Sequence, residues 1–181
     1  MKFCSHCGHT LTQKVPEGDS RLRAVCSHCE TIHYINPKIV AGTIPVYNSK
    51  VLLCKRAIEP RLGLWTLPAG FMEMQESTTQ AAIRETWEEA IAKVVLDDIY
   101  TIISVPHIGQ VHIFFRAKLT DGKHGAGEES LATQLFSEED IPWNEIAFPT
   151  VKRTLRHFFE DRKNNHFPVH TTEIIHDRLR L

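Results

Sequence analysis

The sequence predicts an α+β fold, in which a mixed β-sheet lies between helices and a small separate unit precedes it. Three observations support this class. Runs rich in β-branched residues alternate with two long segments of helical character. Two C-x-x-C pairs occupy the amino-terminal region. The chain has 181 residues, of which 42% are hydrophobic and 24% charged, so it is long enough to bury one good core.

The charge and hydropathy patterns exclude several classes of protein. A net charge of −1 gives no global attraction to nucleic acid or to an anionic membrane. No apolar run approaches the roughly 20 residues that span a bilayer, and the amino-terminal MKFCSHCG lacks the apolar segment of a signal peptide. We therefore expect a cytoplasmic protein with no membrane partner, and the charge balance disfavours a nucleic-acid partner.

The amino-terminal segment, residues 1–35, is predicted to be a zinc ribbon. Cys4 and Cys7 form one C-x-x-C pair, Cys26 and Cys29 form the second, and 18 residues lie between the two pairs. This spacing is typical of a four-cysteine site in which the zinc is structural. Disulfides or a thioredoxin-like redox pair are the alternatives, which a reducing compartment and the doubled motif disfavour. Nearby histidines offer replacement ligands: His6, His9, His28 and His33.

The elements of the main domain are predicted from periodic runs between turn signals. Strands are expected at 39–46, 51–56, 94–105, 110–119 and 133–136. Pro149 opens a helix whose core-facing stripe is Val151, Leu155, Phe158 and Phe159. Cys54 lies in an apolar run and is expected in the core. The main domain is placed at residues 36–163, and residues 164–181 form a tail without clear periodicity.

An earlier helix is predicted to begin directly after Ser77, because Ser77 and Gln80 have the S-x-x-Q form of a capping box. At about 100° per residue, three carboxylates share one face: Glu85, Glu88 and Glu89. Carboxylates in such a cluster repel one another unless a cation lies between them, and all-oxygen ligand sets suit Mg²⁺ or Mn²⁺. The opposite face is expected to be buried: Ala82, Ile83, Trp87 and Ala90.

The spacing around this helix resembles the Nudix box, G-x5-E-x7-R-E-U-x-E-E-x-G-U. The matching residues are Gly70, Glu76, Arg84, Glu85, Glu88 and Glu89. The resemblance implies the Nudix α/β/α sandwich and metal-dependent hydrolysis of a nucleoside diphosphate linked to another moiety. It also implies that Glu85, Glu88 and Glu89 bind the catalytic metal together with the Gly70 carbonyl. Glu76 would then assist and Arg84 would orient the carboxylates.

Two residues depart from the box. Thr86 replaces an apolar residue, and its methyl group can still pack. Ile91 replaces the second glycine, which suits a left-handed helix cap. A β-branched residue adopts that conformation only at a cost of about 1–2 kcal/mol, so we expect the helix to end differently.

Residues outside the helix are also candidates for the site. Arg56 or Arg61 could bind substrate phosphates, because a guanidinium matches phosphate oxygens in a bidentate way. An ordinary surface arginine is the alternative for each. Glu128 and Glu129 lie in a Gly-rich loop, from which Glu129 could act as a catalytic base.

The combination of ribbon and box resembles two Nudix subfamilies. NADH pyrophosphatases carry an S-Q-P-W-P-F-P-x-S signature after the box, which the segment SVPHIGQVHIFF lacks. The plant plastid FAD and ADP-ribose pyrophosphatase subfamily is more similar, through FCSHCG, NPKIVAG and GLWTLPAGFME. This resemblance implies FAD or ADP-ribose as the small-molecule nucleotide substrate, AMP as a product, and a homodimer. NADH is the alternative substrate, and a ligand-sensing or nucleic-acid-binding regulator with a Nudix domain is the alternative of another class.

Overall fold

The computed structural model describes residues 1–175. The chain divides into two compact units, Met1–Pro37 and Lys38–Leu181. The last part of the expected carboxy-terminal tail, residues 176–181, lies outside the described residues. No helix in the described range is long and apolar enough to cross a membrane.

The first unit is a small antiparallel sheet. Its three strands pair in the order β1 (Leu11–Lys14), β2 (Arg23–Cys26) and β3 (Ile32–His33). The buried apolar side chains of the unit, apart from two cysteines, are Ala24 and Val25. So small a core cannot hold a unit of this length folded by apolar burial alone.

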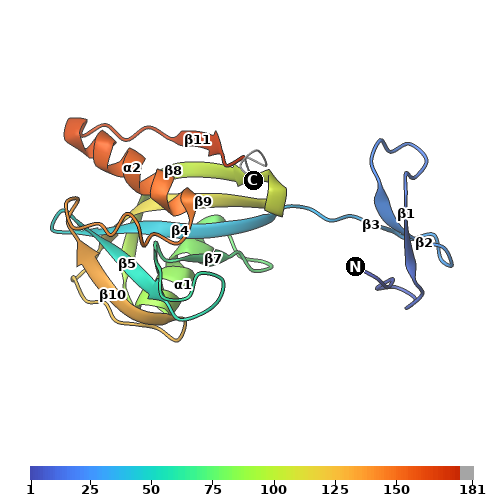
Figure 1. Ribbon diagram of the computed structural model, residues 1–181, viewed down its shortest axis with the longest axis horizontal. Coiled ribbons are helices and arrows are strands. Elements are labelled where there is room, and N and C mark those ends of the chain that lie inside the picture. Colours follow the sequence, from blue (N-terminus) through green and yellow to red (C-terminus); the bar gives the residue numbers. More distant parts are fainter. Residues whose placement is uncertain (176–181) are drawn as a thin grey trace. The chain divides into compact units, whose positions relative to one another are not determined.

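The second unit is built on a mixed sheet with the strand order β10-β5-β4-β9-β8-β11 (Figure 1). Its strands are β4 (Lys38–Tyr47), β5 (Lys50–Arg56), β6 (Trp65–Thr66), β7 (Ala69–Phe71), β8 (Val94–Val105), β9 (Gln110–Leu119), β10 (Ser130–Phe136) and β11 (His170–Glu173). β4 pairs with β9 in parallel, as β11 does with β8, whereas the other pairs are antiparallel. The two short strands β6 and β7 pair with β5 and β4 respectively.

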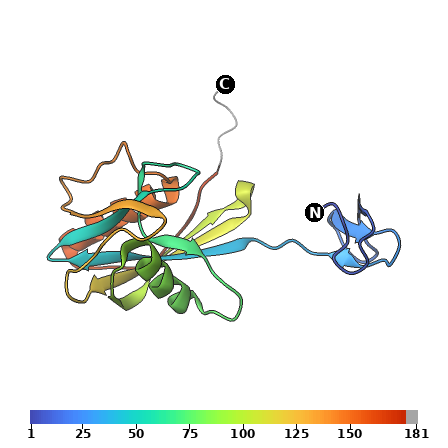
Figure 2. The ribbon, with the colours of Figure 1, turned by 90° about the horizontal axis from the view of Figure 1, so that it is seen from below.

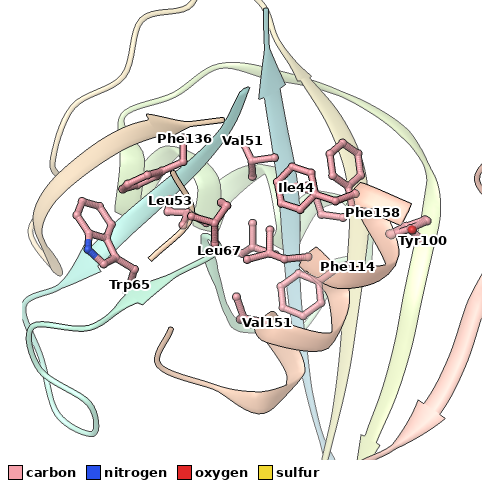
Figure 3. Close-up of a cluster of buried hydrophobic side chains, with 13 residues drawn as sticks. Ile44, Val51, Leu53, Trp65, Leu67, Tyr100, Phe114, Phe136, Val151 and Phe158 are labelled. Carbon is pink, nitrogen blue, oxygen red and sulfur yellow. The ribbon is translucent and has the colours of Figure 1, made fainter. Parts of the chain in front are cut away.

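Two helices, α1 (Thr78–Ala90) and α2 (Pro149–Asn164), cover opposite faces of this sheet (Figure 2). The alternation of side chains along β9 shows the two layers. Phe114 belongs to the cluster that includes Leu155 of α2, whereas Phe115 packs with Ala81 of α1. Figure 3 shows the larger cluster, in which side chains of β4, β5 and β9 meet Phe158 of α2. The predicted α/β/α arrangement with a mixed sheet is therefore confirmed.

The predicted long elements are also confirmed. β8 and β9 have the expected bounds, and the other three predicted strands are one to three residues longer. The α2 stripe is buried as expected: Val151, Leu155, Phe158 and Phe159. Cys54 is buried. The three ribbon strands, β6, β7 and β11 were not predicted, because strands of two to four residues are too short to show a period.

The beginning of α1 is confirmed, and its predicted buried face is confirmed for Ala82 and Ala90 only. Ser77 caps the helix, and its side chain and that of Gln80 form the reciprocal bonds of a capping box. Ile83 and Trp87 are 43% and 45% exposed, so their predicted burial is wrong. The helix is rotated so that smaller residues contact the sheet. These buried residues are Ala81, Ala82, Thr86, Glu89 and Ala90.

The expectation for the end of α1 is also wrong, because Ile91 does adopt the left-handed conformation, with φ 47° and ψ 35°. The Gly-rich loop supports this cap. The N–H groups of Gly125 and Gly127 donate to the carbonyls of Ala90 and Glu89, at 2.8 and 3.1 Å, and so pair carbonyls at the helix end. A Cβ atom at Gly127 would collide with the Glu88 carbonyl oxygen, so the close approach needs glycine.

Candidate metal and catalytic sites

The four ribbon cysteines form a compact group of sulfur atoms. The Sγ atoms of Cys4 and Cys29 are 3.7 Å apart, and that of Cys7 lies 3.4 Å from those of Cys26 and Cys29. All four lie within 4.8 Å of one another. Zinc–sulfur bonds of about 2.3 Å in a tetrahedron place the sulfurs about 3.8 Å apart, so this group fits zinc. None of the cysteines is in a disulfide.

The two halves of the ribbon site are built by similar backbone turns. The Cys4 carbonyl accepts a hydrogen bond from the Gly8 N–H, and the Cys26 carbonyl accepts one from the Glu30 N–H. Gly8 and Glu30 both have positive φ angles, of 77° and 59°. Each C-x-x-C pair is thereby curled so that both thiols point to one side. His33 Nε2 lies 3.3 Å from Cys4 Sγ, and the group of four ligands consists of cysteines.

The second candidate site is centred on Arg84 in α1. Its Nε and Nη2 donate to the two carboxylate oxygens of Glu76 at 2.7 and 3.0 Å. Nη1 donates to Glu85 at 2.7 Å and to Glu88 at 2.8 Å, and Nη2 also reaches the Phe71 carbonyl. The Arg84 guanidinium lowers the pKa of Glu76. Arg84 thus ties the loop before α1 to the acidic face of the helix.

Glu89 and Glu85 lie deeper, against the backbone of β7. Glu89 is only 6% exposed, and its Oε2 accepts a hydrogen bond from the Ala69 N–H at 3.1 Å. A Cβ atom at Gly70 would overlap the Glu85 carboxylate, so glycine there lets β7 approach the helix. Burial raises the pKa of Glu85, and burial together with the charge of Glu85 raises that of Glu89 to about 8.

These carboxylates suit a hard divalent cation chemically. The donors are all oxygen, and burial raises the pKa of Glu85 and Glu89, so a bound cation would favour the ionised form of both side chains. Within residues 1–175, the carboxylate oxygens do not converge as tightly as the four sulfurs, because three of the carboxylates are spread around the Arg84 guanidinium.

The structure separates the remaining predicted residues. The positive charge of Arg56 lowers the pKa of Glu89, and its guanidinium lies 5.1 Å from the centre of the Phe148 ring. The negative charge of Glu129 raises the pKa of Glu85 and Glu89, so its carboxylate lies near the site. Arg61 is exposed, has a φ of 70°, and forms no ion pair with a carboxylate of the described residues. The electrostatic effects of Arg56 and Glu129 place both charges near the acidic site, and the role of Arg61 stays a prediction.

Sequence reasoning missed the contribution of Ala69. Its N–H holds the Glu89 carboxylate in place, and β7 carries it. The Gly-rich loop, expected to carry a catalytic base, also caps α1. Neither role could be found from periodicity, because both depend on backbone groups whose partners are distant in the sequence.

Three features together define a class of metal-dependent hydrolases. These are a mixed sheet between helices, an acidic helix that packs closely against a glycine of β7, and a separate four-cysteine ribbon. The family models agree with this assignment. The model described as Nudix N-terminal matches residues 2–35, and the NUDIX domain model matches residues 36–160. The chain belongs to the Nudix family and is a Nudix hydrolase with an amino-terminal Nudix zinc ribbon.

Individual relatives differ in how much of their length is matched. The NAD-capped RNA hydrolase NudC of Salmonella paratyphi C is 34% identical over 144 residues, which are 78% of this chain and 53% of that protein. The chain spans between a third and about half of the length of such curated relatives. A crystal structure of a NUDIX hydrolase from Nitrosomonas europaea is 50% identical, with a TM-score of 0.93, covering 96% of this chain and 99% of that one.

A more distant structure shows the same fold. An ADP-ribose pyrophosphatase from Streptococcus suis is 22% identical, with a TM-score of 0.61, covering 77% of this chain and all of the other. At this identity the likeness concerns the fold alone.

Proposed function

We propose that this Nudix hydrolase cleaves the diphosphate of FAD or ADP-ribose and releases AMP, with Mg²⁺ or Mn²⁺ as the catalytic ion. The observation that carries the proposal is the placement of Glu85 and Glu89 against β7, beside the Arg84 network. This placement joins, along one side of α1, the oxygen ligands that a hard cation needs and the arginine that orients them.

Each residue has a separate role in this proposal. Glu85, Glu88 and Glu89 hold the ion, together with the carbonyl of Gly70. A bound divalent ion offsets phosphate charge and lowers the pKa of water at phosphorus. Arg84 keeps the carboxylates oriented through the bonds described above, and Glu76 anchors Arg84 from the loop.

Two nearby side chains complete the proposed site. Arg56 is proposed to bind a substrate phosphate, because its charge already acts on Glu89. Glu129 is proposed as the base, because it is exposed and close enough to influence Glu85 and Glu89. Arg61 is the weaker candidate for a phosphate contact.

The proposed organisation has three parts: a ribbon at 1–35, a catalytic domain at 36–163 and a tail at 164–181. A homodimer is part of the proposal. Ile83, Trp87 and Ile91 follow one another at intervals of four residues along α1 and are 42–45% exposed. Such an apolar stripe is suited to an interface between copies of the chain.

A second candidate substrate is NADH or another molecule with an NAD-type diphosphate. The names of relatives such as the NudC proteins favour it. The segment after the box favours FAD and ADP-ribose instead, because it lacks the NADH-type signature. In the structure this segment forms a 3-10 turn, Pro106–Ile108, between β8 and β9.

The test compares kcat/KM for FAD, ADP-ribose and NADH at equal concentrations of Mg²⁺ or Mn²⁺, with AMP measured by chromatography. We expect higher values for FAD and ADP-ribose than for NADH. A higher value for NADH than for both others would refute the preferred substrate and leave the metal site standing. Absence of AMP from all three, with either ion, would refute the proposed activity.

A further inference from the structure

A basic pocket lies between α2 and β11, which run beside each other in Figure 1. Its volume is about 450 Å³. The lining residues are Pro149, Lys152, Arg153, Arg156, His157 and Thr172. α2 covers the face of the sheet opposite α1, so this pocket is separate from the acidic site on α1 (Figure 2).

The three cations of the pocket have no carboxylate partner among residues 1–175. Lys152, Arg153 and Arg156 form none of the ion pairs of the described chain. The acidic residues that follow them in α2 are engaged elsewhere. Glu160 pairs with Lys163 at 2.7 Å, and Asp161 accepts hydrogen bonds from other groups.

The guanidinium of Arg153 is already held in position. Its Nη1 donates to Thr172 Oγ1 at 2.9 Å and to the Glu173 carbonyl at 2.8 Å, which fixes β11 against α2. These two bonds leave the N–H groups of Nε and Nη2 without a partner in the described part of the chain. Arg156 lies 5.8 Å from the centre of the Trp143 ring. The Arg153 guanidinium is therefore held in place before any anion binds, whereas Arg156 is exposed and rests near the Trp143 ring.

His157 adds a flat ring to the pocket rather than a fourth charge. It stacks on His170, with ring centres 4.0 Å apart. Burial, and then the positive charges of His170 and Arg153, lower the pKa of His157. Its neutral ring can accept or donate one hydrogen bond near neutral pH.

We propose that this pocket is a second binding site, which takes a nucleotide-sized ligand bearing at least two phosphate groups. Two guanidinium groups and an ammonium on successive turns of one helix match several phosphate oxygens. A volume of 450 Å³ lies within the range of small-molecule sites and far exceeds that of a single phosphate. The proposal is independent of the substrate cleaved at α1.

Binding is tested by titrating the full chain with inorganic tripolyphosphate in 150 mM NaCl, without divalent metal, and following backbone amide NMR signals. We expect saturable shifts at residues 149–157 and 170–173. The Lys152→Gln/Arg156→Gln variant is expected to bind at least tenfold more weakly. The matched control, Lys118→Gln/Lys123→Gln, removes two exposed charges elsewhere and is expected to change the dissociation constant by less than twofold.

A second titration, with a decamer of oligoadenylate that lacks terminal phosphates, distinguishes the source of the phosphates. Shifts in the pocket with tripolyphosphate support a free polyphosphate or nucleotide as the ligand. Shifts there with the decamer alone would overturn the proposed nucleotide-sized ligand in favour of the phosphodiesters of a nucleic acid. Any of three further results would overturn the proposal. These are equal weakening of tripolyphosphate binding in both double variants, amide shifts confined to α1 and β7, and no saturation with either probe.

Discussion

Glu89 is subject to two opposing demands, because its carboxylate is both a proposed metal ligand and a buried charge. Glu89 is 6% exposed, and burial is the main cause that raises its pKa to about 8. Glu89→Gln keeps the shape and the oxygen that accepts from Ala69 but removes the charge. Without divalent metal, we therefore expect this variant to be more stable than the wild type at neutral pH, although it loses turnover.

The magnitude follows from the shift in pKa. The ordinary value of 4.5 applies to the unfolded chain, and the folded value is about 8. A raised carboxyl pKa means that stability is fully present below pH 4.5 and is lost as the pH rises toward 8. Each pH unit in this window costs about 1.4 kcal/mol, so the loss at pH 7 is about 3 kcal/mol. Glu89→Gln should recover most of this amount.

The assay is urea unfolding at pH 5 and pH 7.5, followed by tryptophan fluorescence. The three tryptophans, Trp65, Trp87 and Trp143, all lie in the second unit, so the signal reports on that unit. Glu88→Gln is the matched control, because the Glu88 side chain is 55% exposed and its loss should change stability little. Saturating Mg²⁺ should stabilise the wild type more than Glu89→Gln. A variant that unfolds more easily at pH 7.5, or that keeps the pH dependence of the wild type, would refute the reasoning.

Four further predictions concern the catalytic helix, the ribbon and the core. Glu88→Gln should lower kcat about a thousandfold, with the melting temperature unchanged; near-normal turnover at saturating Mg²⁺ would contradict the proposed metal site. Protein purified without added metal should contain about one zinc per chain by elemental analysis, and a folded ribbon without zinc would exclude this role. Thr86→Val should cost about 1–3 kcal/mol in urea unfolding, because the buried hydroxyl of Thr43, 2.6 Å from that of Thr86, loses its partner. The double variant with Thr43→Val should cost less than the two single changes together, and simple additivity would exclude the coupling. Burial opposes ionisation of Asp161, but hydrogen bonds from two donors outweigh it and lower its pKa. Its stabilising effect should be present above about pH 4 and lost as the pH falls further, so the difference in unfolding free energy between wild type and Asp161→Asn should shrink at pH 3; a constant difference would argue against the ionised form.

Local spacing predicted the features whose partners are close in the sequence. The start of α1 follows from Ser77 and Gln80, whose reciprocal bonds lie within one helical turn. Each C-x-x-C pair of the ribbon is closed by a local turn, in which the carbonyl of the first cysteine accepts a hydrogen bond from an N–H four residues later, and the doubled spacing predicted the group of four. The stripe of α2 was visible because a long helix repeats its pattern over several turns.

Only the tertiary structure decided which side of α1 meets the sheet. Glu89 is buried and Trp87 is partly exposed because the small residues of the helix pack on β4 and β9. The shape of the side chains, and not their average hydropathy, decides which face of α1 packs against the sheet. Ile91 takes a left-handed conformation because the loop through Gly125 supplies hydrogen bonds from more than thirty residues away. Likewise β11 forms because it pairs with β8, which would otherwise be at the edge of the sheet. Its four residues are too few to show the periodicity that would predict a strand. The sequence by itself thus determined the ligand types and their local spacing, whereas long-range packing decided their burial and hence the charge that each one bears.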